Sequence, residues 1–95
     1  MAEVIYKPGE LLTFATIEKE IKRLSSYFRG LRSKKTIVIN VSSVKHCDSA
    51  GLALLIEAKR LARQRHIACF IQGMTADLAA LAQFCRVEEI LALES

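Results

Sequence analysis

The sequence predicts an α/β domain, with a small mixed, partly parallel β-sheet and helices packed on it. Three observations support this fold class. Residues 36–41 form a β-branched, apolar run without strict alternation, which is typical of a strand buried on both faces. Residues 67–71 form a second short apolar run, and helical periodicity occupies the stretches between such runs. Strands that alternate with helices form βαβ units, which place their strands in parallel.

The length and composition predict one domain over residues 1–95. Each half of a 95-residue chain would be too small to bury its own core. Hydrophobic residues make up 52% of the chain, a share that excludes intrinsic disorder. No apolar stretch approaches the roughly 20 residues of a membrane span, and the first residues do not resemble a secretory leader. We therefore expect a cytoplasmic domain.

The first predicted strands flank a turn. Pro8 fixes one backbone angle and Gly9 tolerates a positive φ, so this pair predicts a tight turn. The segments on either side, residues 4–6 and 11–14, are apolar and rich in strand-forming residues. These features predict a short hairpin.

A helix is predicted to follow. Thr16 is the expected N-cap, and Gly30 is the expected stop. Apolar residues recur between them at helical spacing, on one face: Ile17, Ile21, Leu24 and Phe28.

The second half of the chain repeats the alternation. A helix is expected over residues 50–64, and a third helix, capped by Thr75, is expected to carry Leu78, Leu81, Ala82 and Cys85. Residues 87–93 are apolar and predict a further short helix or strand. The chain holds three cysteines without a C-x-x-C pair: Cys47, Cys69 and Cys85. We expect them to pack as small buried hydrophobes rather than to form disulfides.

The junction of residues 48–51 carries the clearest functional signal. It joins a buried strand to a helix, at the end of a parallel sheet where ligands and partners usually bind. Asp48 or Ser49 can cap the helix, and Gly51 permits close backbone packing. The free N–H groups of the first turn could also bind an anion. The alternative is a capped helix start with no functional role.

The helix after this junction has apolar residues outside its core-facing stripe. The stripe consists of Leu54, Leu55, Ala58, Leu61 and Ala62. Leu52, Ala53 and Ile56 lie on its flank, beside Arg60. An apolar patch bordered by arginine predicts a partner surface, which could also support a homodimer. The alternative is that a neighbouring segment covers Leu52 and Ile56.

Residues 44–55, which read VKHCDSAGLALL, resemble the signature of STAS domains, a family named for sulfate transporters and anti-sigma factor antagonists. The resemblance extends over nearly the whole chain and includes Gly9-Glu10-Leu11 and the strand at residues 36–41. The phrase AGLALL is most similar to the MlaB-like branch, whose members belong to a phospholipid transporter. The family usually has a further strand before the Gly-Glu-Leu step, so a shortened N-terminus is expected here.

The resemblance implies two functions. The MlaB-like branch implies a non-catalytic subunit that binds and stabilises the ATPase subunit of an ABC transporter for phospholipids, and so reaches the inner membrane only through its complex. The hydroxyl after the aspartate, Ser49 here, would then lie at the contact. The anti-sigma branch implies a switch phosphorylated by a partner kinase. Because Ala50 stands beside the glycine, Ser49 is the hydroxyl left for that switch.

Other function classes are disfavoured. His46 lies next to Cys47 and Asp48, but adjacency in sequence is not the geometry of a catalytic triad or a zinc site. The chain has no glycine-rich phosphate loop, so we expect no enzyme, metal or cofactor. Residues 19–65 carry 12 basic and 3 acidic residues, a net charge of +9 that could attract nucleic acid. This span lacks an aromatic stacking platform, so we expect a solvated basic face and no nucleic-acid binding.

Overall fold

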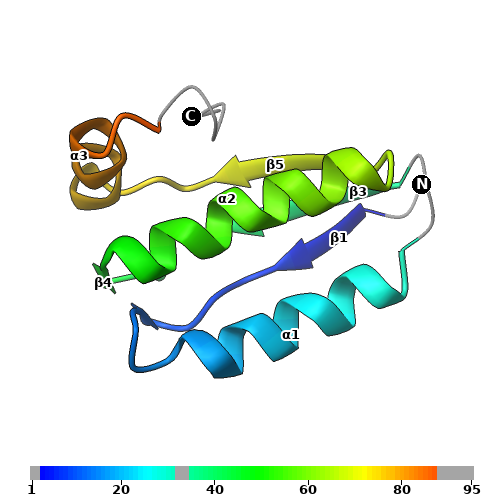
Figure 1. Ribbon diagram of the computed structural model, residues 1–95, viewed down its shortest axis with the longest axis horizontal. Coiled ribbons are helices and arrows are strands. Elements are labelled where there is room, and N and C mark those ends of the chain that lie inside the picture. Colours follow the sequence, from blue (N-terminus) through cyan, green and yellow to red (C-terminus); the bar gives the residue numbers. More distant parts are fainter. Residues whose placement is uncertain (1–2, 32–34, 88–95) are drawn as a thin grey trace.

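The computed structural model describes residues 3–31 and 35–87, and these form a layered α/β fold (Figure 1). Strands and helices alternate through most of the chain, as the sequence predicts. In order, the elements are β1 (Glu3–Tyr6), β2 (Leu11–Leu12), α1 (Ile17–Arg29), β3 (Thr36–Asn40), β4 (His46–Cys47), α2 (Ser49–Gln64), β5 (Ala68–Gln72) and α3 (Ala76–Phe84).

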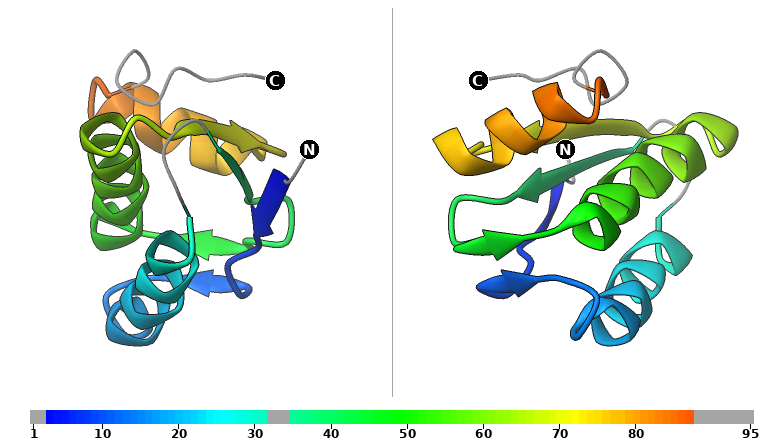
Figure 2. Two further views of the ribbon diagram at one scale, coloured as in Figure 1. Left: turned by 90° about the vertical axis from the view of Figure 1, so that its right-hand side faces the viewer. Right: turned by 60° about the vertical axis from the view of Figure 1, so that its left-hand side comes forward.

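The main sheet has the strand order β1-β3-β5, and both of its strand pairs are parallel. The central strand β3 is buried over Ile37–Ile39 on both faces, which confirms the interpretation of this apolar run. Helices α1 and α2 lie together on one side of this sheet (Figure 2). Buried side chains from these layers form a single core.

The hairpin predicted at Pro8 and Gly9 is wrong. β1 pairs with β3, and β2 pairs with β4 in a separate two-stranded sheet, both in parallel. Pro8 and Gly9 predict only a local turn. The direction that the chain takes after this turn depends on Glu20, which lies 11 residues further along the sequence. The backbone N–H of Gly9 donates to the Glu20 carboxylate of α1 at 3.1 Å, and this bond directs the chain out of the main sheet.

Helix α1 ends at Arg29, and the predicted stop, Gly30, is its C-cap residue. Leu24 and Phe28 are buried in the core and Ile17 packs against it, but Ile21 is 46% exposed. Thr16 is the N-cap residue, but its side chain makes no capping bond. The Thr16 hydroxyl instead accepts from the N–H of Thr13 at 3.1 Å and donates to the carbonyl of Leu11 at 2.7 Å, so it stabilises the preceding turn.

Helix α3 begins as predicted, because the Thr75 hydroxyl accepts from the N–H of Leu78 at 3.1 Å. Leu78 and Ala82 are buried. Cys85 caps the helix and is exposed, so the expectation that it packs in the core is wrong; Cys47 and Cys69 are half-buried. The element expected over residues 87–93 lies, apart from Val87, outside the described residues.

Candidate functional site

The candidate site lies where two short parallel strands end. Leu12, the last residue of β2, is in register with Cys47, the last residue of β4. The carbonyl of Glu10 accepts from the N–H of His46 and secures the start of this pair. The pairing brings the segment after Leu12 beside Asp48, the N-cap residue of helix α2.

The Asp48 carboxylate joins these two segments. Its Oδ1 caps α2, accepting from the N–H of Ala50 at 3.0 Å and from the N–H of Gly51 at 3.1 Å. Its Oδ2 accepts from the N–H of Phe14 at 2.9 Å. The bond from Phe14 and the two cap bonds hold the pKa of this carboxyl below its usual value. Asp48 is therefore ionised at neutral pH. Of the two capping residues that the sequence allowed, Asp48 and Ser49, Asp48 is the N-cap.

Phe14 is a candidate site residue that the sequence interpretation missed. Its side chain is 79% exposed, although Asp48 and the Thr13–Thr16 turn hold its backbone. Large aromatic side chains on fixed backbones are common anchors of protein interfaces. The available signal was the turn-forming pair of threonines around Phe14, which we instead interpreted as the end of a strand.

Four predicted site residues share one face of α2. Ser49, Ala53, Ile56 and Arg60 recur at helical spacing, and we call this row the α2 stripe. Ser49, Ala53 and Arg60 are exposed, and Ile56 is half-buried against the core. The stripe begins beside the Asp48 cap and therefore beside Phe14.

Leu52 does not belong to this surface. Its side chain is only 2% exposed and lies in the core, which corrects the prediction that it contacts a partner. The reason is that α2 packs against α1 and β2 as well as against the main sheet. Its buried face is consequently wider than the stripe that periodicity alone indicated.

The hydroxyl of Ser49 makes no hydrogen bond within residues 3–31 and 35–87, so the first residue of the α2 stripe is open to a partner. Arg60, at the other end, is engaged by Glu57, with Nε–Oε1 at 2.9 Å and Nη2–Oε2 at 2.5 Å. This pairing raises the pKa of Arg60 and lowers that of Glu57. The stripe thus ends in an ion pair rather than in an unpaired cation.

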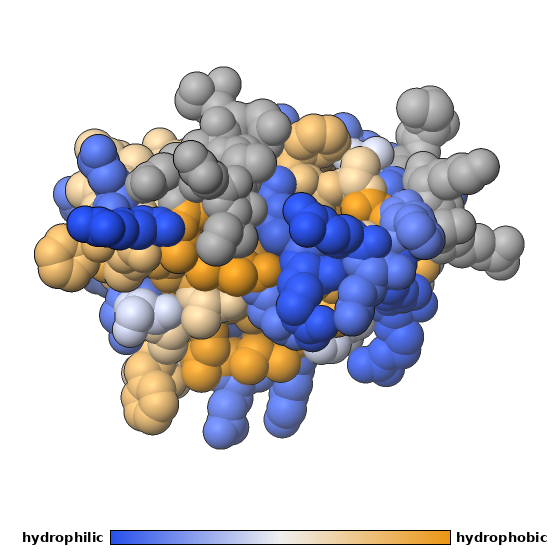
Figure 3. Space-filling view, turned by 45° about the horizontal axis from the view of Figure 1, so that its top comes forward, coloured by the Kyte–Doolittle hydropathy of each residue, from blue (hydrophilic) through white to orange (hydrophobic). Residues whose placement is uncertain are grey.

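The surface around the stripe divides into two parts (Figure 3). Hydrophobic residues gather on the side of α3 and the first turns of α2, and hydrophilic residues gather toward the last turns of α2. The apolar part thus lies toward the first turns of α2, where the α2 stripe begins.

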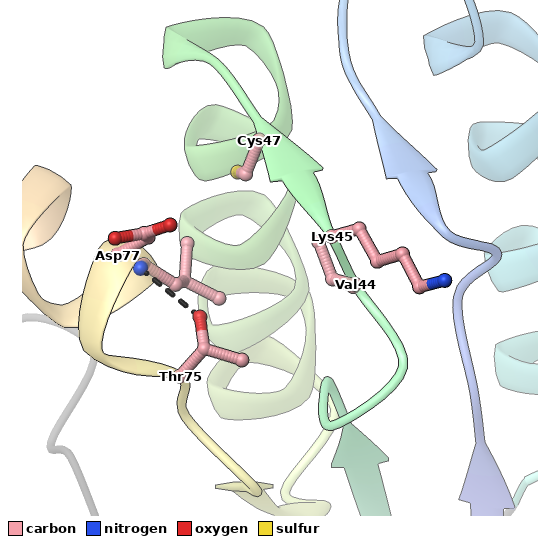
Figure 4. Close-up of a pocket in the computed structure, with 6 residues that line it drawn as sticks. Val44, Lys45, Cys47, Thr75 and Asp77 are labelled. Atoms are coloured by element: carbon pink, nitrogen blue, oxygen red, sulfur yellow. Dashed lines mark hydrogen bonds between the residues drawn. The ribbon is translucent and has the colours of Figure 1, made fainter.

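A small pocket of about 30 Å³ lies behind the site, between β4 and α3 (Figure 4). The Lys45 side chain points away from it, and its ammonium pairs with the Glu10 carboxylate at 3.7 Å. Burial, and then the charge of Asp48, raise the pKa of the Cys47 thiol to about 11. The thiol is therefore protonated at neutral pH and is a poor nucleophile. A pocket of this volume has room for about one water molecule.

In the part of the chain that the structure describes, metal-ligating side chains do not gather at the site. Among the residues that the structure describes, no group of three or more His, Cys, Asp or Glu side chains could hold a metal ion. Within the same residues, no helix is both long enough and apolar enough to cross a bilayer.

The Asp48 carboxylate leads to a pH-dependent prediction. Its pKa is lower in the folded protein, so its contribution to stability is complete above the unfolded-state value of about 3.9 and is lost as the pH falls through the folded value. Asp48→Asn keeps one oxygen for the cap but presents an amide donor to the N–H of Phe14. We expect the variant to be less stable than wild type at pH 7, with the difference shrinking as the pH falls from about 5 toward 2.

Urea denaturation at several pH values measures this difference. Amide hydrogen exchange gives a second readout, because Phe14 should lose protection in Asp48→Asn while Gly51 keeps most of its own. Equal protection of Phe14 in both proteins would contradict the role assigned to Oδ2.

Comparison with known families identifies the chain. The family model described as "Mlab, STAS domain" matches residues 20–93, which include β3, the Asp48 cap and the whole of α2. A comparison with curated proteins finds no match. The match covers most of the chain and agrees with the small parallel α/β architecture. The chain therefore belongs to the MlaB-like STAS domain family.

Proposed function

We propose that this protein is a non-catalytic STAS subunit that binds and stabilises the ATPase subunit of an ABC transporter for phospholipids. It acts in the cytoplasm and reaches the inner membrane only through this complex. The proposal combines the family with one observation. Phe14 and the α2 stripe form an exposed surface on a fixed backbone, held together by the two oxygens of Asp48.

The composition of this surface suits protein recognition. Phe14 supplies an exposed aromatic anchor, and Ala53 is small enough for a partner to approach the helix closely. Ser49 offers an exposed hydroxyl, whereas Arg60 and its partner Glu57 form a polar rim. A central aromatic anchor with a polar rim is the usual composition of a protein–protein interface.

The groups behind the surface favour binding over catalysis. The Cys47 thiol is held protonated, and the adjacent pocket is too small for a nucleotide or a lipid headgroup. The Asp48 carboxylate has three backbone N–H partners and is thereby committed to structure. These features support a subunit that acts through its partner.

Ala53→Arg tests the proposed surface. Ala53 is exposed in the middle of the α2 stripe, so the larger side chain should leave the fold intact and obstruct the partner. We expect the affinity for the ATPase subunit to fall at least about tenfold, which corresponds to about 1.4 kcal/mol. The measurement is co-purification followed by titration calorimetry with the purified ATPase subunit.

Ala80→Arg is the matched control, because Ala80 is an exposed alanine on α3. It should bind the ATPase subunit as wild type does, and circular dichroism should show both variants folded. Equal binding by Ala53→Arg and Ala80→Arg would contradict the proposed surface.

The second candidate is an anti-sigma factor antagonist that is switched by phosphorylation of Ser49. The observation in its favour is the exposed hydroxyl of Ser49 in the first turn of α2. A phosphate there would add nearly two negative charges next to the Asp48 carboxylate, which already accepts from the N–H groups of the first turn. Recovery of an anti-sigma kinase in place of an ABC ATPase from cell lysate would favour this function over the first.

A further inference from the structure

Strand β1 is an edge of the main sheet. Its residues pair with β3 on one side, from Glu3 with Thr36 to Tyr6 with Ile39. On the other side, β1 has no strand partner within residues 3–31 and 35–87. An unpaired edge offers backbone N–H and C=O groups to a further strand.

The side chains of β1 alternate between the two faces of the sheet. Tyr6 faces α1, because its hydroxyl donates to the Glu20 carboxylate at 2.6 Å. Glu3 and Ile5 therefore point to the opposite face, where Ile5 is 54% exposed. Lys7 continues this series, since a residue that precedes proline favours extended backbone.

The face of β1 away from α1 therefore presents an acid, an apolar residue and a base at regular spacing. This order is self-complementary under a two-fold rotation about Ile5. In an antiparallel pair of two such strands, Glu3 lies opposite Lys7 of the second copy, and Ile5 lies opposite Ile5 of the second copy. A pair with its two-fold axis at Glu3 or at Lys7 would instead oppose like charges.

We propose that β1 pairs with β1 of a second copy of this chain, in antiparallel orientation with Ile5 on the two-fold axis. The two main sheets then form one continuous six-stranded sheet with the order β5-β3-β1-β1-β3-β5. The pair is isologous and closed, so it ends at a dimer.

An apolar row on the sheet face supports the same arrangement. Ile5 is in register with Val38 of β3, and Val38 is in register with Phe70 of β5. Phe70 is 38% exposed, and the row ends at Ile5 on the open edge. Pairing through β1 would extend this row across the dimer and cover part of Ile5. The α2 stripe lies on a helix at the opposite face of the sheet, so the dimer leaves it accessible.

Sedimentation equilibrium over a range of protein concentrations tests the proposal. Wild type should show a monomer–dimer equilibrium, and Glu3→Lys should weaken the dimer about tenfold or more because it places two lysines opposite each other. The charge-swapped double variant, Glu3→Lys with Lys7→Glu, should restore the wild-type affinity because the two-fold axis pairs the exchanged charges again. A monomer at every concentration, or a dimer that Glu3→Lys leaves unchanged, overturns the proposal.

Cysteine cross-linking tests the register. Ile5→Cys should form a disulfide between the two copies upon mild oxidation, because directly opposed antiparallel residues lie within disulfide range. Glu3→Cys is the matched control and should not cross-link to itself, because residue 3 lies opposite residue 7. Both variants are made in a Cys85→Ser background, since Cys85 is exposed, and peptide mass spectrometry identifies the linked residues. Efficient linkage through position 3 in place of position 5 would reject this register.

Discussion

Gly51→Ala should bring the domain close to unfolding. A Cβ atom at this position would lie 2.0 Å from the carbonyl oxygen of Leu12, 2.8 Å from the carbonyl carbon of Leu12 and 2.9 Å from the Cys47 sulfur. Two of these atoms are backbone, so the clash cannot be relieved by a rotamer change. We expect a loss of at least ~3 kcal/mol, at the upper end of the usual cost of overpacking.

The expected loss of folding stability is the opposite of what helix propensity alone would predict. Alanine within a helix is ordinarily favoured over glycine by about 1 kcal/mol. The contact with β2 should outweigh that preference, because moving α2 away from Leu12 would break the bond from the Phe14 N–H to the Asp48 carboxylate and the bond from the Asp48 N–H to the Leu12 carbonyl.

Gly30→Ala is the matched control for this prediction. Gly30 has an ordinary φ of −86°, and the nearest atom to an added Cβ, the carbonyl oxygen of Tyr27, lies at 3.9 Å. We expect its stability to remain within about 0.5 kcal/mol of wild type. Urea denaturation, monitored by circular dichroism, compares the stability of Gly51→Ala with that of Gly30→Ala. A Gly51→Ala protein as stable as Gly30→Ala would show that α2 does not need this close approach.

The local signals in the sequence predicted the elements well, but they could not predict the contacts between distant segments. The cap of α2 depends on residues within one helical turn, and the sequence narrowed it to Asp48 or Ser49. The bond from Asp48 to Phe14 joins residues 34 positions apart and exists only because β2 and β4 pair in parallel. A short strand such as β2 carries no periodicity from which this pairing could be inferred.

The error at Leu52 has a different cause. Helical periodicity locates the centre of a buried face, but the width of that face depends on how many neighbours the helix has. α2 packs against both the sheet and α1, so Leu52 is buried and Ile56 is half-buried. Ala53 stays exposed, which is why it is the better position for testing the proposed interface.

Buried Glu20 on α1 is the other position where a large effect is expected. Its side chain is 2% exposed, and its carboxylate accepts from the Tyr6 hydroxyl at 2.6 Å, the Gly9 N–H at 3.1 Å and Arg23 Nη1 at 2.9 Å. Burial and then the bond to this carboxylate raise the pKa of Tyr6, which therefore remains the donor. The Arg23 guanidinium also lies over the Tyr6 ring, 5.4 Å from its centre.

Glu20→Ala should cost about 3–5 kcal/mol, because it leaves the Tyr6 hydroxyl and the Gly9 N–H without an acceptor and Arg23 without its counter-charge. That loss is a large fraction of the ~5–15 kcal/mol that stabilises a typical domain. Tyr6→Phe is a milder variant of the same cluster, and its stability is compared with that of Glu20→Ala. It removes one donor and leaves the carboxylate with Gly9 and Arg23, so it should cost only about 1 kcal/mol.

Denaturant titration of both variants measures these costs, and amide exchange at Gly9 reports whether the chain still leaves β1 in the same direction. We expect Gly9 to lose protection in Glu20→Ala and to keep it in Tyr6→Phe. If the two variants were equally stable, the carboxylate would contribute only its bond to Tyr6. The path from β1 to β2 would then be set by Pro8 and the β2–β4 pairing alone.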